Sequence, residues 1–143
     1  MRLYRRVAPD TRAATRDLLV RTGTRSLCAV SVIDVTERSF EFLVLDRSTV
    51  MPVVVDFWAP WCAPCLALTP LLQDAVAARA GEVVLAKLDI DLCPLLWRRY
   101  EVRTVPAVKA FRDREVVAEF TGVRSPADVE RFFEELVASW ARA

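Results

Sequence analysis

The chain has 143 residues, of which 54% are hydrophobic and 27% charged, with a formal net charge of +1 and three glycines. This composition fits one globular domain with a sizeable core and excludes a disordered chain. The chain has no histidine, which excludes a histidine base, a Cys-His nucleophile and histidine-ligated metal. No apolar run is long enough to span a membrane.

The first 29 residues form an N-terminal extension that carries seven arginines and two aspartates. Asp10 is a candidate cap for a short helix that stops at Gly23. A transit peptide has a similar composition, but we favour an extension of a cytoplasmic protein, with an organelle matrix as the alternative location. No apolar segment indicates a secretory signal, and aromatic residues are sparse beyond Tyr4, so we expect no nucleic-acid partner.

From residue 30 to residue 143, short β-branched runs alternate with segments of helical spacing. This alternation predicts a single α/β domain. The expected strands are residues 30–33, 53–57, 83–88, 105–111 and 116–120, and the expected helices follow Thr36, Trp61, Cys93 and Ser125. Pro70 lies inside the second helix and should bend it.

Two cysteines follow the most apolar of the expected strands. Cys62 and Cys65 are separated by two residues and fall in the first turn of the helix after Trp61. Unpaired N–H groups and the helix dipole favour a thiolate there, which makes Cys62 the candidate nucleophile. Cys65 is one turn further on and can attack a mixed disulfide on Cys62. Pro64 fits a helical turn that needs no N–H from it.

The segment 53–59, followed by Trp61-Cys62-Ala63-Pro64-Cys65, is similar to the active-site segment of the thioredoxin family. Residues 86–91 resemble the family's next strand, residues 103–106 its cis-proline loop, and Gly122 the glycine near the end of its last strand. The resemblance covers roughly residues 30–140. It implies a thioredoxin fold, in which helices flank both faces of a central mixed sheet.

The resemblance also implies roles for residues around the dithiol. An unpaired carboxylate in an apolar strand is costly, and Asp56 matches the buried acid that exchanges a proton with Cys65. Lys87 is the candidate that tunes the charge state of Asp56, although it could also be an ordinary solvated lysine. Pro106 matches the cis-proline, although it could simply begin a strand. The residues expected to contact a client protein are Trp61, Ala63, Pro64 and Val105.

The function implied is that of a monomeric protein-disulfide reductase, which thioredoxin reductase or an equivalent donor restores to the dithiol form. Its redox-active Cys62–Cys65 disulfide needs no further cofactor or metal. A redox-linked co-chaperone that binds unfolded chains is the alternative, and an oxidant or isomerase is less favoured. Ala63 replaces the commoner glycine, and Leu66 stands where many members carry a basic residue. The resemblance therefore does not predict the reduction potential of the Cys62–Cys65 pair.

The remaining cysteines, Cys28 and Cys93, are not assigned to the dithiol chemistry. Zinc ligation by all four cysteines is a weak alternative, because they lack the paired spacing of structural zinc sites. We expect Cys93, at the start of a helix, to be an inert, half-buried thiol. Nothing in the sequence assigns a partner to Cys28.

Overall fold

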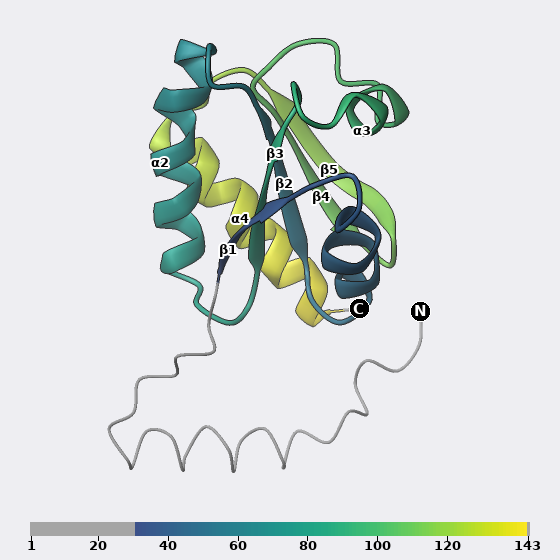
Figure 1. Ribbon diagram of the computed structural model, residues 1–143. Coiled ribbons are helices and arrows are strands. Elements are labelled where there is room, and N and C mark those ends of the chain that lie inside the picture. The colour runs from purple at the N-terminus through teal and green to yellow at the C-terminus, as the bar shows by residue number, and fades with distance from the viewer. Residues whose placement is uncertain (1–30, 143) are drawn as a thin grey trace, which may run out of the picture.

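The computed structural model describes residues 31–142, which contain a single five-stranded mixed sheet in the order β1-β3-β2-β4-β5 (Figure 1). The strands are β1 (Val32–Val35), β2 (Val53–Trp58), β3 (Val84–Asp89), β4 (Ala107–Arg112) and β5 (Glu115–Thr121). Strands β1 and β2 run parallel to β3, whereas β4 runs antiparallel to both β2 and β5. The predicted α/β class is confirmed.

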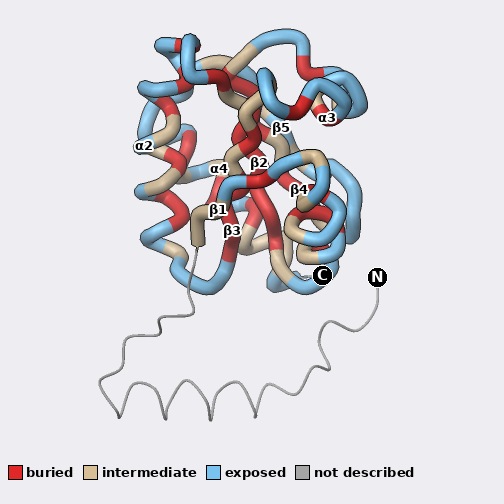
Figure 2. Tube along the Cα trace, in the orientation of Figure 1, coloured by how far each residue is buried: buried red, intermediate tan, exposed pale blue. Residues whose placement is uncertain are grey.

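Helices cover both faces of this sheet, as predicted (Figure 1). They are the π-helix η2 (Glu41–Asp46), the 3-10 helix η3 (Arg47–Thr49), α2 (Ala63–Ala77), α3 (Pro94–Arg99) and α4 (Pro126–Ala141). One core cluster contains residues of α2 and α4, and the other contains residues of η2 and α3. Figure 2 shows the buried positions concentrated along the central strands and on the inner sides of the helices.

Strand β2 holds the centre of the fold because both of its faces are buried. Val54 packs into the cluster beneath α2 and α4, while Val55 and Phe57 pack into the opposite cluster. Each such side chain contributes about 1.5–3 kcal/mol when it is fully buried. The strand therefore fixes the position of the cysteine segment that follows its carboxyl end.

Three expected elements differ in their boundaries or form. The first strand begins at Val32 rather than residue 30, and β4 begins at Ala107, after Pro106. Thr36 forms capping-type hydrogen bonds in the turn before the helix, since its Oγ1 accepts from the Ser39 N–H at 3.3 Å and its own N–H donates to the Ser39 Oγ at 2.9 Å. The N-cap of the helix itself, however, is Phe40 rather than Thr36. The segment then continues as π-helix η2 rather than as a regular α-helix.

The turn between β4 and β5 forms without a glycine. Asp113 and Arg114 have φ values of 49° and 71°, the left-handed conformation that two-residue hairpin turns of type I′ require. Ser48 holds this turn, because its carbonyl accepts from the Asp113 N–H at 2.9 Å and its Oγ accepts from the Arg114 N–H at 2.8 Å. The Arg114 guanidinium also pairs with Glu41 and Asp46. Contacts from distant segments thus stabilise a conformation that arginine seldom adopts.

Helix α4 closes the domain in the way that the sequence predicts. The Ser125 Oγ accepts from the Asp128 N–H at 3.1 Å, with Pro126 at the first helical position. Phe133 and Leu136 are buried against the sheet. The helix expected after Asp10, Cys28 and the proposed domain boundary at residue 30 lie outside the described residues.

Candidate active site

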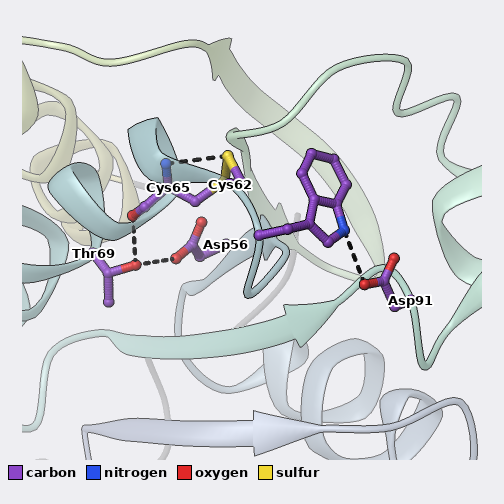
Figure 3. Close-up of a disulfide and its surroundings, with 6 residues drawn as sticks. Asp56, Cys62, Cys65, Thr69 and Asp91 are labelled. Atoms are coloured by element: carbon purple, nitrogen blue, oxygen red, sulfur yellow. Dashed lines mark hydrogen bonds between the residues drawn. A yellow bond between two sulfur atoms is a disulfide. The ribbon is translucent and has the colours of Figure 1, made fainter.

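The dithiol lies where β2 passes into α2, as predicted. Cys62 is the N-cap of α2, and Cys65 follows within the first turn. The two cysteines form a disulfide with a Cα–Cα distance of 5.3 Å, so the structure is that of the oxidised protein. The Cys65 N–H donates to the Cys62 Sγ at 3.2 Å (Figure 3). This donor and the helix dipole would stabilise negative charge on Cys62 once the disulfide is reduced.

Asp56 lies beneath the dithiol on β2 and is completely buried. Its Oδ2 accepts from the Thr69 hydroxyl at 3.2 Å, while its Oδ1 has no hydrogen-bond partner among the described residues. Burial raises the pKa of the Asp56 carboxyl to about 6, although the Thr69 hydrogen bond and the Lys87 charge both lower it. Asp56 therefore titrates close to neutral pH, where a proton acceptor is most useful.

Lys87 is the direct neighbour of Asp56 on β3 in the parallel register. Its Nζ lies 4.6 Å from the centre of the Trp58 ring. No ion pair of Lys87 occurs within residues 31–142, so its effect on Asp56 is exerted through space rather than through a direct contact. The structure thus brings together the predicted acid and the predicted cation, without a salt bridge between them.

The expected client-binding residues surround the disulfide. Val105 packs against a small cluster formed by Ala59, Cys62 and Cys65, and the Val105–Pro106 peptide bond is cis, as the resemblance implies. Ala63 and Pro64 are exposed. Trp61 has 67% of its surface exposed, and its indole Nε1 donates to the Asp91 Oδ2 at 3.0 Å (Figure 3).

Comparison with known proteins decides the family, because the thioredoxin family model matches residues 31–135. The chain belongs to the thioredoxin family. Thioredoxin C-2 of Corynebacterium nephridii is 36% identical over 107 residues, which make up 75% of this chain and 97% of that protein. Thioredoxin of Mycobacterium tuberculosis is also 36% identical, over 75% of this chain and 90% of that protein. Mitochondrial thioredoxin of Mus musculus is 45% identical over 68% of this chain, but the match spans only 58% of that protein.

Membership of the thioredoxin family makes the chain a thiol-disulfide oxidoreductase, and its redox centre is the Cys62–Cys65 pair. Thioredoxins act on protein disulfides, with a reductase as electron donor, and generally need no cofactor. Within residues 31–142, no group of acidic or cysteine side chains could hold a metal ion. In the same part of the chain, no helix is both long and apolar enough to cross a bilayer.

The prediction of a half-buried thiol at Cys93 is wrong, because only 1% of its surface is exposed. Its Sγ points toward the Val35 carbonyl at 3.9 Å, inside the cluster beneath η2 and α3. Burial, with the nearby Glu37 charge, raises the pKa of the Cys93 thiol. Because the thiolate is the reactive form, this environment makes Cys93 a poor nucleophile.

Sequence reasoning missed Thr69, which connects Asp56 to the active-site helix. Its hydroxyl lies 3.2 Å from the Asp56 Oδ2 and 3.0 Å from the Cys65 carbonyl oxygen. When Asp56 is protonated, its O–H can donate to the Thr69 oxygen while Thr69 donates to Cys65. A signal was present, because Thr69 follows Cys65 by four residues and so lies on the same face of α2.

Replacing Thr69 by valine is expected to raise the pKa of Asp56, because the hydroxyl favours the ionised carboxylate. We expect an upward shift of up to about 1 unit, which a carbon-13 NMR titration of the Asp56 carboxyl would measure. Thr69→Ser keeps the hydroxyl and should keep the titration within a few tenths of a unit. An unchanged titration in Thr69→Val would contradict this role for Thr69.

Proposed function

We propose that Cys62 is the nucleophile and Cys65 the resolving thiol in the reduction of client-protein disulfides. The Cys62 thiolate attacks one sulfur of the client disulfide, forms a mixed disulfide and releases one client thiolate, which takes up a proton from water. Cys65 then loses its proton and attacks the Cys62 sulfur, which releases the second client thiolate. The client gains two electrons and two protons, and the Cys62–Cys65 disulfide is left.

The placement of Cys62 is the observation that supports this order of attack. As the N-cap of α2, its sulfur accepts the Cys65 N–H at 3.2 Å and lies at the positive end of a 15-residue helix. Cys65 is buried one turn further in, with 1% of its surface exposed. Cys62 is also buried, with 4% of its surface exposed, so the helix-cap position of its sulfur, more than accessibility, favours Cys62 as the nucleophile.

We propose that Asp56 accepts the Cys65 proton during resolution. With a pKa of about 6, most Asp56 carboxyls are ionised at neutral pH, and the unpartnered Oδ1 is free to take a proton, directly or through water. Lys87 and Thr69 both lower the Asp56 pKa and so increase the ionised fraction. Lys87 acts in this proposal as the tuning cation that the resemblance implies.

The client site is proposed to consist of Trp61, Ala63, Pro64 and Val105, with the loop at Pro106 pairing with an extended client segment. Leu66 is 55% exposed and adds to this apolar surface on α2. We further propose a monomer that is recycled by thioredoxin reductase or an equivalent donor, and a cytoplasmic location with an organelle matrix as the alternative. The boundary between the extension and the domain is proposed at residue 30.

Trapping of the mixed disulfide tests these roles. In Cys65→Ser the first step proceeds and the second cannot, so a disulfide-containing client should accumulate as a covalent adduct visible by non-reducing electrophoresis. Cys93→Ser, at a buried cysteine outside the dithiol, should trap nothing. If Cys62→Ser instead accumulates the adduct, the assignment of nucleophile and resolving thiol is reversed. Protection of a client from aggregation by a Cys62→Ser, Cys65→Ser double variant would favour the co-chaperone alternative.

A further inference from the structure

Three charged residues lie side by side across the sheet near its β1 edge. The register pairs Lys87 on β3 with Asp56 on β2 and, on its other side, with Asp34 on β1. Paired residues of neighbouring strands project to the same face of a sheet. The residues two positions earlier on the three strands lie on the side of α2 and α4, since Leu85 and Val54 belong to the core cluster there and Val32 packs against it. The side chains of Asp34, Lys87 and Asp56 therefore share that face.

Burial decreases along this row from the centre of the sheet to its edge. Asp56 is completely buried, Lys87 is half-buried and Asp34 is exposed. Neighbouring strands are about 4.8 Å apart, so the two aspartates are separated by about 10 Å with the lysine between them. Charges at this distance still interact when one of them is buried, because screening by salt is weak there.

The position of the Lys87 ammonium leaves it available to both carboxylates. It lies over the Trp58 ring at 4.6 Å, and the ion pairs of residues 31–142 do not include Lys87. A lysine side chain has a long flexible stem, so a small shift can bring its charge toward either aspartate. The interaction of Lys87 with Asp56 therefore depends on what else attracts the ammonium.

We propose that Asp34 is a positioning residue for Lys87, and that its carboxylate competes with Asp56 for the Lys87 ammonium. Asp34 thereby sets how strongly Lys87 stabilises the ionised form of Asp56. The consequence for catalysis rests on the proposed role of Asp56 as proton acceptor. The electrostatic coupling itself does not depend on that role.

The other carboxylates near Lys87 are either hydrogen-bonded to another group or exposed on α2. Asp89, two residues further along β3, lies on the same face, but its Oδ1 accepts from the Asp91 N–H at 2.9 Å. Helix α2 packs against β3 and contributes one charged residue, Asp74, which is exposed. Its Thr69 hydroxyl contacts Asp56 rather than Lys87. Asp34 is thus the carboxylate best placed to compete with Asp56.

The test measures the pKa of the Asp56 carboxyl directly, by carbon-13 NMR titration of the full-length oxidised protein. Asp34→Asn should lower the pKa of Asp56 by about 0.5 unit, because it removes a like charge and releases Lys87 toward Asp56. Asp74→Asn removes an exposed carboxylate outside the row and should produce less than half of that shift. The pH profile of the resolution step should move in parallel with the titration.

Repeating the Asp34→Asn substitution in a Lys87→Met protein distinguishes two explanations. Asp34 either positions Lys87 or simply repels the Asp56 carboxylate. In Lys87→Met, Asp34→Asn removes only the direct repulsion between the aspartates, so its effect on the Asp56 pKa should fall by at least half. An unchanged Asp56 pKa in Asp34→Asn overturns the proposal, and an equal shift with and without Lys87 overturns the competition for the lysine. If the Asp56 pKa shifts as expected but the pH profile of the resolution step does not change, Asp56 is not the proton acceptor, while the electrostatic coupling to Asp34 is still supported.

Discussion

Asp56→Asn is expected to stabilise the folded protein by about 3 kcal/mol at pH 8 but by only about 0.5 kcal/mol at pH 4. Burial raises the Asp56 pKa from 3.8 in the unfolded chain to about 6 in the folded protein. Below pH 3.8 both states carry the proton, so burial of the acid costs little. As the pH rises toward 6 the unfolded chain ionises first, and above pH 6 the full cost of the buried carboxylate destabilises the folded state.

Urea unfolding of the oxidised protein at the two pH values would measure this effect. Asp74→Asn serves as the control, because Asp74 is exposed on α2 and should show no comparable pH-dependent gain. Equal stability of Asp56→Asn and the unmodified protein at pH 8 would contradict the raised pKa. The result expected here is a gain in stability at the expense of the proposed proton acceptor, a trade-off common at active sites.

Cys62→Ser is expected to lower the rate of protein-disulfide reduction by at least about 1,000-fold, down to the background of the reductant alone. A serine hydroxyl is not ionised near neutral pH and cannot form the mixed disulfide that carries the reaction. The measurement is the initial rate of insulin reduction with a limiting external dithiol.

Cys93→Ser is the matched control for this experiment. Cys93 is buried in the cluster beneath η2 and α3 and should contribute nothing to turnover, so its replacement should leave the rate within about twofold. A residual rate above a tenth of normal in Cys62→Ser would show that another thiol can begin the reaction.

The parts of the site that the sequence predicts are those encoded locally. A β-branched run followed by helical spacing places Cys62 and Cys65 at a strand-to-helix junction, and the structure puts them there. The capping-type hydrogen bonds at Thr36 and Ser125 are short-range for the same reason, since each involves residues three positions apart. The pattern of strands and helices therefore determines the position of the dithiol before any tertiary contact is known.

Apart from Thr69, the contacts that sequence reasoning missed depend on segments far apart in the chain. The Trp61 indole binds Asp91, 30 residues away. The Glu37 carboxylate accepts from the Leu95 N–H at 2.7 Å and so caps α3 from the end of β1. Ser48 holds the β4–β5 turn across 66 residues. Such contacts depend on the sheet order and on the packing of loops, which local periodicity does not encode.

The burial of Asp56 also has a calorimetric consequence. With the pKa values above, the folded protein at pH 5 holds about 0.8 proton more on Asp56 than the unfolded chain does. The chain has no histidine to add proton exchange of its own near this pH. Unfolding at pH 5 should therefore release protons to the buffer, and the measured heat of unfolding should vary with the ionisation enthalpy of the buffer chosen.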